Sequence, residues 1–94
     1  MAYSVMKGRT LTTKVIVYTK EGCHLCERVI AELQKISVVR PLEISTVDIT
    51  SEASLFERYK DIIPVVEIDG KVRLGGTALA NRSTLPTVLL NALK

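Results

Sequence analysis

The strongest constraint on the fold of this chain is a change of hydrophobic period between two neighbouring segments. Residues 14–18, "KVIVY", form a β-branched apolar run that predicts a strand buried on both faces. After "TKEG", apolar side chains recur with the i, i+3, i+4, i+7 spacing of a helix face, at Cys26, Val29, Ile30 and Leu33. We expect this helix to begin at Cys23 and to end near Ile36 or Ser37. A strand that leads directly into a helix predicts a strand–helix–strand unit with a parallel pair of strands.

The segments that follow complete this unit and extend it. Residues 42–49, "LEISTVDI", alternate apolar and polar side chains and predict the second strand. Thr50 or Ser51 is a suitable cap for a short helix, whose apolar face would contain Leu55, Phe56 and Tyr59. We expect Tyr59 and Tyr18 to pack in the core; the alternative for Tyr18, which ends the first strand close to the cysteines, is that it shapes a substrate groove.

A hairpin and a last helix end the chain. Residues 62–74, "IIPVVEIDGKVRL", contain Asp69-Gly70 between alternating apolar residues, which is the strongest short hairpin signal. Ser83 or Thr84 would cap the last helix. We therefore predict an α/β fold, a mixed four-stranded sheet flanked by about three helices. With 94 residues, 47% of them hydrophobic, the chain suits one domain over residues 14–94, preceded by a flexible arm over residues 1–13.

Charge and hydropathy restrict the class of protein. The net charge is +3, and the basic residues are scattered among acidic ones, so no run of the kind that follows nucleic-acid phosphates is present. The N-terminal residues lack the apolar region of a secretory signal, and no apolar run reaches the ~18 residues of a membrane span. We expect a cytoplasmic protein that binds neither nucleic acid nor membrane.

The two cysteines of the chain, Cys23 and Cys26, lie at the expected start of the first helix. A bridge between residues so close in sequence closes a very small loop and adds little stability. In a reducing compartment such a pair is more often redox-active or metal-binding. A helix N-terminus stabilises a thiolate and lowers a cysteine pKa from ~8.5 toward ~3.5–7.5. Cys23 would then attack a substrate disulfide, and Cys26, on the apolar stripe and more buried, would resolve the mixed disulfide.

A metal site is the alternative interpretation of the same motif. Structural zinc needs four ligands, whereas this region offers Cys23, Cys26 and His24, the single histidine. A second subunit would have to complete the site, as in a dimeric iron–sulfur or zinc protein that uses Cys23. His24 itself has two interpretations. A protonated imidazole would tune the pKa of the Cys23 thiol, or His24 is an exposed first-turn residue with little role.

Pro64 opens the predicted third strand, a position that proline tolerates, and spacing alone favours an ordinary trans bond there. However, "VIVYTKEGCHLCERVIAEL", "VDIT" and "IIPVVEIDGK" together resemble the thioredoxin superfamily, and within it small glutaredoxin-like proteins with a Cys-His-Leu-Cys motif. The resemblance covers residues 14 to about 75. It implies that Pro64 is cis, beside the dithiol, and that the backbone of Ile63 binds the thiol substrate.

The same resemblance implies a thiol–disulfide oxidoreductase that reduces protein or glutathione-mixed disulfides with Cys23 and Cys26. The reductant would be glutathione or a thioredoxin-reductase-like flavoprotein, and no cofactor would be tightly bound. Lys20 matches a lysine that glutaredoxins typically use for glutathione. Gly75 and Gly76 resemble the glycine pair of the family, but Thr77 and Ala78 follow where an acidic residue is usual. The pair also suits an ordinary strand-to-helix turn, so glutathione stays an expectation of the family alone.

Overall fold

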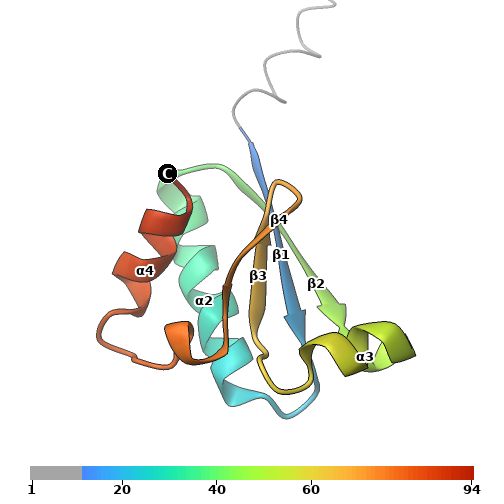
Figure 1. Ribbon diagram of the computed structural model, residues 1–94. Helices are drawn as coiled ribbons and strands as arrows, with labels where there is room; N and C mark the ends of the chain where they lie inside the picture. The colour runs from blue at the N-terminus through green and yellow to red at the C-terminus, as the bar shows by residue number, and fades with distance from the viewer. Residues whose placement is uncertain (1–11) are drawn as a thin grey trace, which may run out of the picture.

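The computed structural model describes residues 12–94. Its elements follow the predicted order of strand, helix, strand, helix, hairpin and helix (Figure 1). They are β1 (Thr13–Thr19), α2 (His24–Val39), β2 (Leu42–Asp48), η1 (Ile49–Ser51), α3 (Ala53–Tyr59), β3 (Val65–Ile68), β4 (Lys71–Gly75), η2 (Gly76–Leu79) and α4 (Leu85–Ala92), where η marks a 3-10 helix. Among the described helices, none is long and apolar enough to span a membrane.

The four strands form one mixed sheet in the order β2-β1-β3-β4. β1 pairs in parallel with β2, with Val15 opposite Ile44, and antiparallel with β3. β3 and β4 form the predicted hairpin, in which Asp69 (φ 48°) and Gly70 (φ 88°) both adopt the left-handed conformation that such tight turns require. The predicted mixed four-stranded sheet flanked by three α-helices is confirmed for the described part of the chain.

One face of the sheet is covered by α2 and α4, which lie side by side in Figure 1. The main core fills the space between these helices and the sheet. Its fully or nearly fully buried members are Val15, Val17, Val29, Leu33, Ile36, Val66, Ile68, Leu79, Leu85, Leu89 and Leu93. Since β1 and β3 contribute every second residue to this cluster, the pleat of the strands sets which side chains enter the core.

The opposite face is covered less completely. Ile49, Tyr59 and Val65 form a second buried cluster, joined by Tyr18, Leu55, Phe56 and Ile63. Because α3 is only 7 residues long, it covers only part of this face. Ile16 and Tyr18 are therefore half-buried. The prediction that residues 14–18 are buried on both faces was therefore wrong for one face.

Helix α2 extends beyond its predicted end. It continues to Val39, and the N–H of Arg40 donates to the carbonyl of Ile36 at 2.9 Å. Pro41 follows immediately and disfavours helical geometry at the residue before it. The last turn therefore carries the exposed Val38 and Val39.

The expected cap of α3 was also wrong. Asp48 caps the short helix η1 instead, accepting from the Thr50 N–H at 2.8 Å, and Glu52 stands at the N-cap of α3 without a side-chain bond. Thr84 occupies the expected N-cap position of α4, also without a side-chain bond. Of the predicted N-terminal arm, residues 1–11 lie outside the described residues, and Thr13 already belongs to β1.

Candidate functional site

The two cysteines form a disulfide at the N-terminus of α2, with their Cα atoms 5.2 Å apart. Cys23 is the N-cap of the helix (φ −88°, ψ 99°), and its Sγ accepts a hydrogen bond of 3.0 Å from the Cys26 N–H. The Cys23 carbonyl accepts from the Glu27 N–H at 3.1 Å and begins the helix. The sulfur of Cys23 thus takes the place that a hydroxyl or carboxylate oxygen has in an ordinary cap. On reduction, the same N–H would stabilise negative charge on Cys23.

The two sulfurs differ in their access to solvent. The side chain of Cys26 is fully buried on the core side of α2, whereas Cys23 is only half-buried. The expectation that Cys26 is the more buried cysteine is confirmed. Of the two cysteines, Cys23 is therefore the one that an external group can approach, whereas Cys26 is shielded from solvent.

The loop between β1 and α2 holds the dithiol close to the sheet. The N–H of Cys23 donates to the Lys20 carbonyl at 3.2 Å, and Gly22 has a φ of 83°, which favours glycine. The Lys20 side chain is exposed. The pKa of Asp48 is lowered by hydrogen bonds from Thr50, first from its side chain and then from its backbone, and further by the positive charge of Lys20. The positive charge of Lys20, in the dithiol loop, thus acts on Asp48 at the C-terminal end of β2.

A second loop meets the first at the same end of the sheet. Tyr18, at the end of β1, pairs with Val65, at the start of β3, so the cysteine loop and the Ile62–Pro64 loop leave the sheet together. The Ile63–Pro64 peptide bond is cis, and Pro64 is buried. Ile62 is 44% exposed. Within residues 12–94, the N–H and carbonyl of Ile63 form no hydrogen bond, so both groups are free to bind an extended chain.

The glycine pair lies against this second loop. The Gly76 N–H donates to the Pro64 carbonyl at 3.1 Å, and a Cβ on Gly76 would lie 3.4 Å from both the Cα and the carbonyl oxygen of Ile62. Gly76 also has a φ of 51°. Gly75 ends β4 and Gly76 begins η2, so the pair forms the strand-to-helix turn that was one interpretation of the sequence. Thr77 and Ala78 are exposed and provide no carboxylate.

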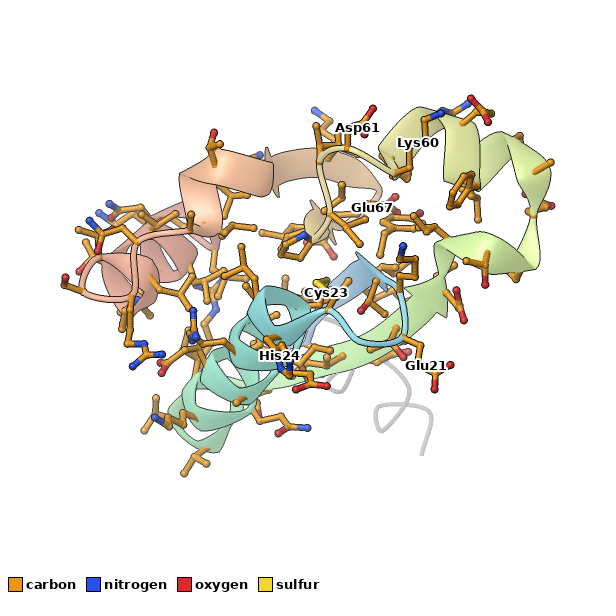
Figure 2. All side chains as sticks on the ribbon, turned by 90° about the horizontal axis from the view of Figure 1, so that it is seen from below. Glu21, Cys23, His24, Lys60, Asp61 and Glu67 are labelled. Atoms are coloured by element: carbon orange, nitrogen blue, oxygen red, sulfur yellow. A yellow bond between two sulfur atoms is a disulfide. The ribbon has the colours of Figure 1, made fainter. Side chains whose placement is uncertain are left out.

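His24 faces a carboxylate rather than a sulfur atom. Its Nδ1 lies 3.6 Å from Oε1 of Glu27, and the side chains are 89% and 70% exposed. In Figure 2, His24 projects from the first turn of α2 on the side away from the Cys23 sulfur, and Glu21 points into solvent from the preceding loop. A role of His24 in tuning the dithiol stays a prediction.

Sequence reasoning missed one polar contact near the site. Packing was the preferred expectation for Tyr18, and its ring does lie 4.9 Å from that of Tyr59. Its hydroxyl also donates to Oε1 of Glu67 at 2.8 Å. Burial, followed by the hydrogen bond and charge of Glu67, raises the pKa of Tyr18 to about 12. Alternation places both residues on one face of the sheet, but only the strand register brings them together.

The metal alternative receives no further ligands from the fold. Within the part of the chain that the structure describes, no group of three or more His, Cys, Asp or Glu side chains is arranged to hold a metal ion. A cluster or zinc site would therefore depend on a partner, as the sequence already indicated.

Comparison with known proteins supports the thiol-redox interpretation of the Cys23–Cys26 pair. A family model described as "Glutaredoxin-like domain (DUF836)" matches residues 14–87. A search of curated proteins finds no significant match. Among solved structures, protein Ne2328 from Nitrosomonas europaea is similar at 28% identity with a TM-score of 0.68, covering 87% of this chain and 92% of that one.

Two further structures are similar over most of their length. A disulphide isomerase from Xylella fastidiosa Temecula1 has 25% identity and a TM-score of 0.57, with 96% of this chain and 86% of that chain covered. A malarial protein has 15% identity and a TM-score of 0.56, with 88% and 99% covered. The malarial protein supports the fold alone.

Proposed function

The chain belongs to the glutaredoxin-like family of the thioredoxin superfamily, and we propose that it is a thiol–disulfide oxidoreductase that reduces protein or glutathione-mixed disulfides. The family and the closely spaced cysteine pair support a thiol-redox role. The observation that carries the finer proposal is the N-cap geometry, in which the Cys26 N–H donates to the half-buried Cys23 sulfur while Cys26 itself is buried. This asymmetry is what an attacking and a resolving thiol require.

In the proposed reaction, the Cys23 thiolate attacks one sulfur of the substrate disulfide. The Cys23–substrate bond forms, the substrate disulfide breaks, and the leaving thiolate takes a proton from water. Cys26, as its thiolate, then attacks Sγ of Cys23, and the second substrate sulfur leaves. The dithiol has lost two electrons and holds the disulfide seen in the structure. Two glutathione molecules, or the dithiol of a flavoprotein reductase, return the two electrons.

The two loops beside the dithiol suggest how a substrate binds. The free N–H and carbonyl of Ile63 would pair with the backbone of the residue that carries the substrate sulfur. The exposed Lys20 would attract a carboxylate of glutathione. The similar protein from Xylella fastidiosa is a disulphide isomerase, and the same exchange chemistry underlies both isomerisation and reduction. We place this activity in the reducing cytoplasm, with no tightly bound cofactor.

Reduction of hydroxyethyl disulfide by glutathione, coupled to glutathione reductase, tests the proposal. Cys23→Ser should reduce the rate to background. The matched variant Cys26→Ser should keep part of the activity and accumulate a glutathione adduct on Cys23, because only the resolving step is lost. Activity of Cys23→Ser equal to that of the parent would contradict the proposal. Iron or zinc in freshly purified protein, bound through Cys23, would favour the dimeric metal-binding alternative.

A further inference from the structure

Charge is distributed unevenly along the chain. The sequence contains 13 Lys and Arg and 10 Asp and Glu, for a net charge of +3. Residues 70–94 contain no Asp or Glu at all, and their basic residues are Lys71, Arg73, Arg82 and Lys94. Everything before Gly70 is therefore close to neutral, and the positive excess of the protein resides on β4, on the segment between η2 and α4, and on the last residue.

Three of these cations are exposed and form no ion pair within residues 12–94. They are Lys71 and Arg73 on β4 and Arg82 in the segment between η2 and α4, and we name them together the basic edge. Two basic residues elsewhere do form ion pairs, whereas Lys14, Lys20, Arg28, Arg40 and Arg58 form none within the described residues either. Lys35 pairs with Glu32, and Lys60 pairs with Glu57, each at 3.2 Å. The basic edge thus keeps its full charge available to an external group.

The backbone of β4 is also unpaired on its outer side. β4 is the last strand in the order β2-β1-β3-β4, so the side away from β3 has no strand partner among the described elements. Val72, between Lys71 and Arg73, is 53% exposed. Charged side chains on an edge strand commonly prevent pairing with a second copy, but the same edge accepts a partner strand of opposite charge.

The C-terminal end of β4 lies against the Ile62–Pro64 loop, which leaves the sheet beside the cysteine loop. β4 ends at Gly75, and the next residue, Gly76, bonds to the Pro64 carbonyl and contacts Ile62. Figure 1 shows β4 running down to η2 at the end of the molecule where α2 begins with its cysteines. The end of β4, the Ile62–Pro64 loop and the cysteine loop therefore lie at the same end of the sheet.

We propose that the basic edge docks an acidic polypeptide that presents its disulfide to Cys23. This inference rests on the proposed function and names its substrate class, an acidic protein rather than a small neutral disulfide. Opposite charges around a reactive site accelerate encounter and orient the partner. The acceleration decreases with salt, because the screening length falls from ~30 Å at 0.01 M to ~8 Å at 0.15 M ionic strength.

Two disulfide-bonded peptides test the inference, identical except that Glu or Lys flanks the cysteines. At low salt the parent should have a kcat/KM about tenfold higher for the acidic peptide, and this ratio should shrink toward one by ~0.2 M salt. Arg73→Glu/Arg82→Glu should remove or reverse the preference. The control Lys14→Glu/Lys35→Glu changes the net charge by the same amount, from +3 to −1, but at exposed sites outside the basic edge. It should keep most of the preference.

Reduction of the neutral hydroxyethyl disulfide distinguishes a failure of the docking proposal from a failure of the proposed redox function. Both double variants should match the parent on it, because neither alters the dithiol. If the parent reduces no disulfide, the proposed function fails. The docking surface is then still tested by NMR, where a cysteine-free acidic peptide should shift the amides of residues 71–76 and 82 but a basic peptide should not.

Three outcomes would overturn the inference. One is an equal rate for both peptides at low salt, and another is an equal loss of preference in the two double variants. The third is a stronger response of residues 71–82 to a single-stranded oligonucleotide, or to dimerisation of the protein itself, than to the acidic peptide. Nucleic acid or a second copy would then be the occupant of the basic edge.

Discussion

The hydroxyl of Tyr18 donates a hydrogen bond to Oε1 of Glu67 at 2.8 Å, joining β1 to β3 on the face of the sheet opposite α2. The Tyr18 ring also contacts Tyr59, whose carbonyl accepts from the Ile62 N–H at 2.9 Å. Tyr18→Phe should destabilise the protein by about 1–2 kcal/mol at pH 7, because a half-buried carboxylate loses its donor. Urea denaturation measures this. An unchanged midpoint would show that water replaces the hydroxyl without cost.

The same bond predicts a loss of stability at alkaline pH. The pKa of Tyr18 is raised to about 12 in the folded protein, against about 10 for an unfolded tyrosine. The neutral phenol therefore stabilises the fold fully below pH ~10, and this contribution is lost as pH rises toward 12. The urea midpoint of the parent should fall more steeply over this range than that of Tyr18→Phe. Parallel curves would contradict the assigned pKa.

Gly76 should be sensitive to substitution for a reason that Gly70 does not share. Both have positive φ, so alanine strains either backbone by roughly 1 kcal/mol. Only at Gly76 would the added methyl approach the backbone of Ile62, at 3.4 Å, whereas nothing lies within 4 Å at Gly70. Gly76→Ala should therefore raise KM for a disulfide peptide severalfold, and Gly70→Ala should affect stability alone. Equal KM values for the two variants would show that Gly76 does not contribute to substrate binding.

Two valines on α2 provide a matched test of the core. Val29 is fully buried, and Val39 is 84% exposed. Val29→Ala should cost about 2 kcal/mol through lost burial and the cavity left behind. Val39→Ala should change the free energy of unfolding by less than about 0.5 kcal/mol. Comparable losses would mean that the last turn of α2 is covered in solution.

Features encoded by short stretches were predicted correctly from the sequence. The change of period after residue 18 locates β1 and α2, and Asp69-Gly70 locates the β3–β4 hairpin. The apolar stripe of α2 also identified Cys26 as the buried cysteine. In each case residues close together in the sequence determine the local structure, so it can be predicted without knowing which distant residues are in contact.

Features that depend on competition or on strand register were not predicted. Asp48 lies next to η1 and binds both the N–H and the hydroxyl of Thr50, so Thr50 cannot serve as the cap of α3. The Tyr18–Glu67 bond requires the β1–β3 register, which places Ile16 opposite Glu67 and Tyr18 one step along the same face. Neither the capping by Asp48 nor the Tyr18–Glu67 hydrogen bond can be predicted from composition or hydrophobic periodicity.

A redox titration of the metal-free protein tests whether Cys23 and Cys26 act as a redox-active dithiol. The protein would be equilibrated in defined glutathione buffers, its free thiols alkylated, and its intact mass measured. We expect one two-electron transition between about −120 and −270 mV, the range of known redox domains, and we expect both Cys23→Ser and Cys26→Ser to abolish it. If Cys23 and Cys26 formed no internal disulfide across this range, the dithiol mechanism would be contradicted.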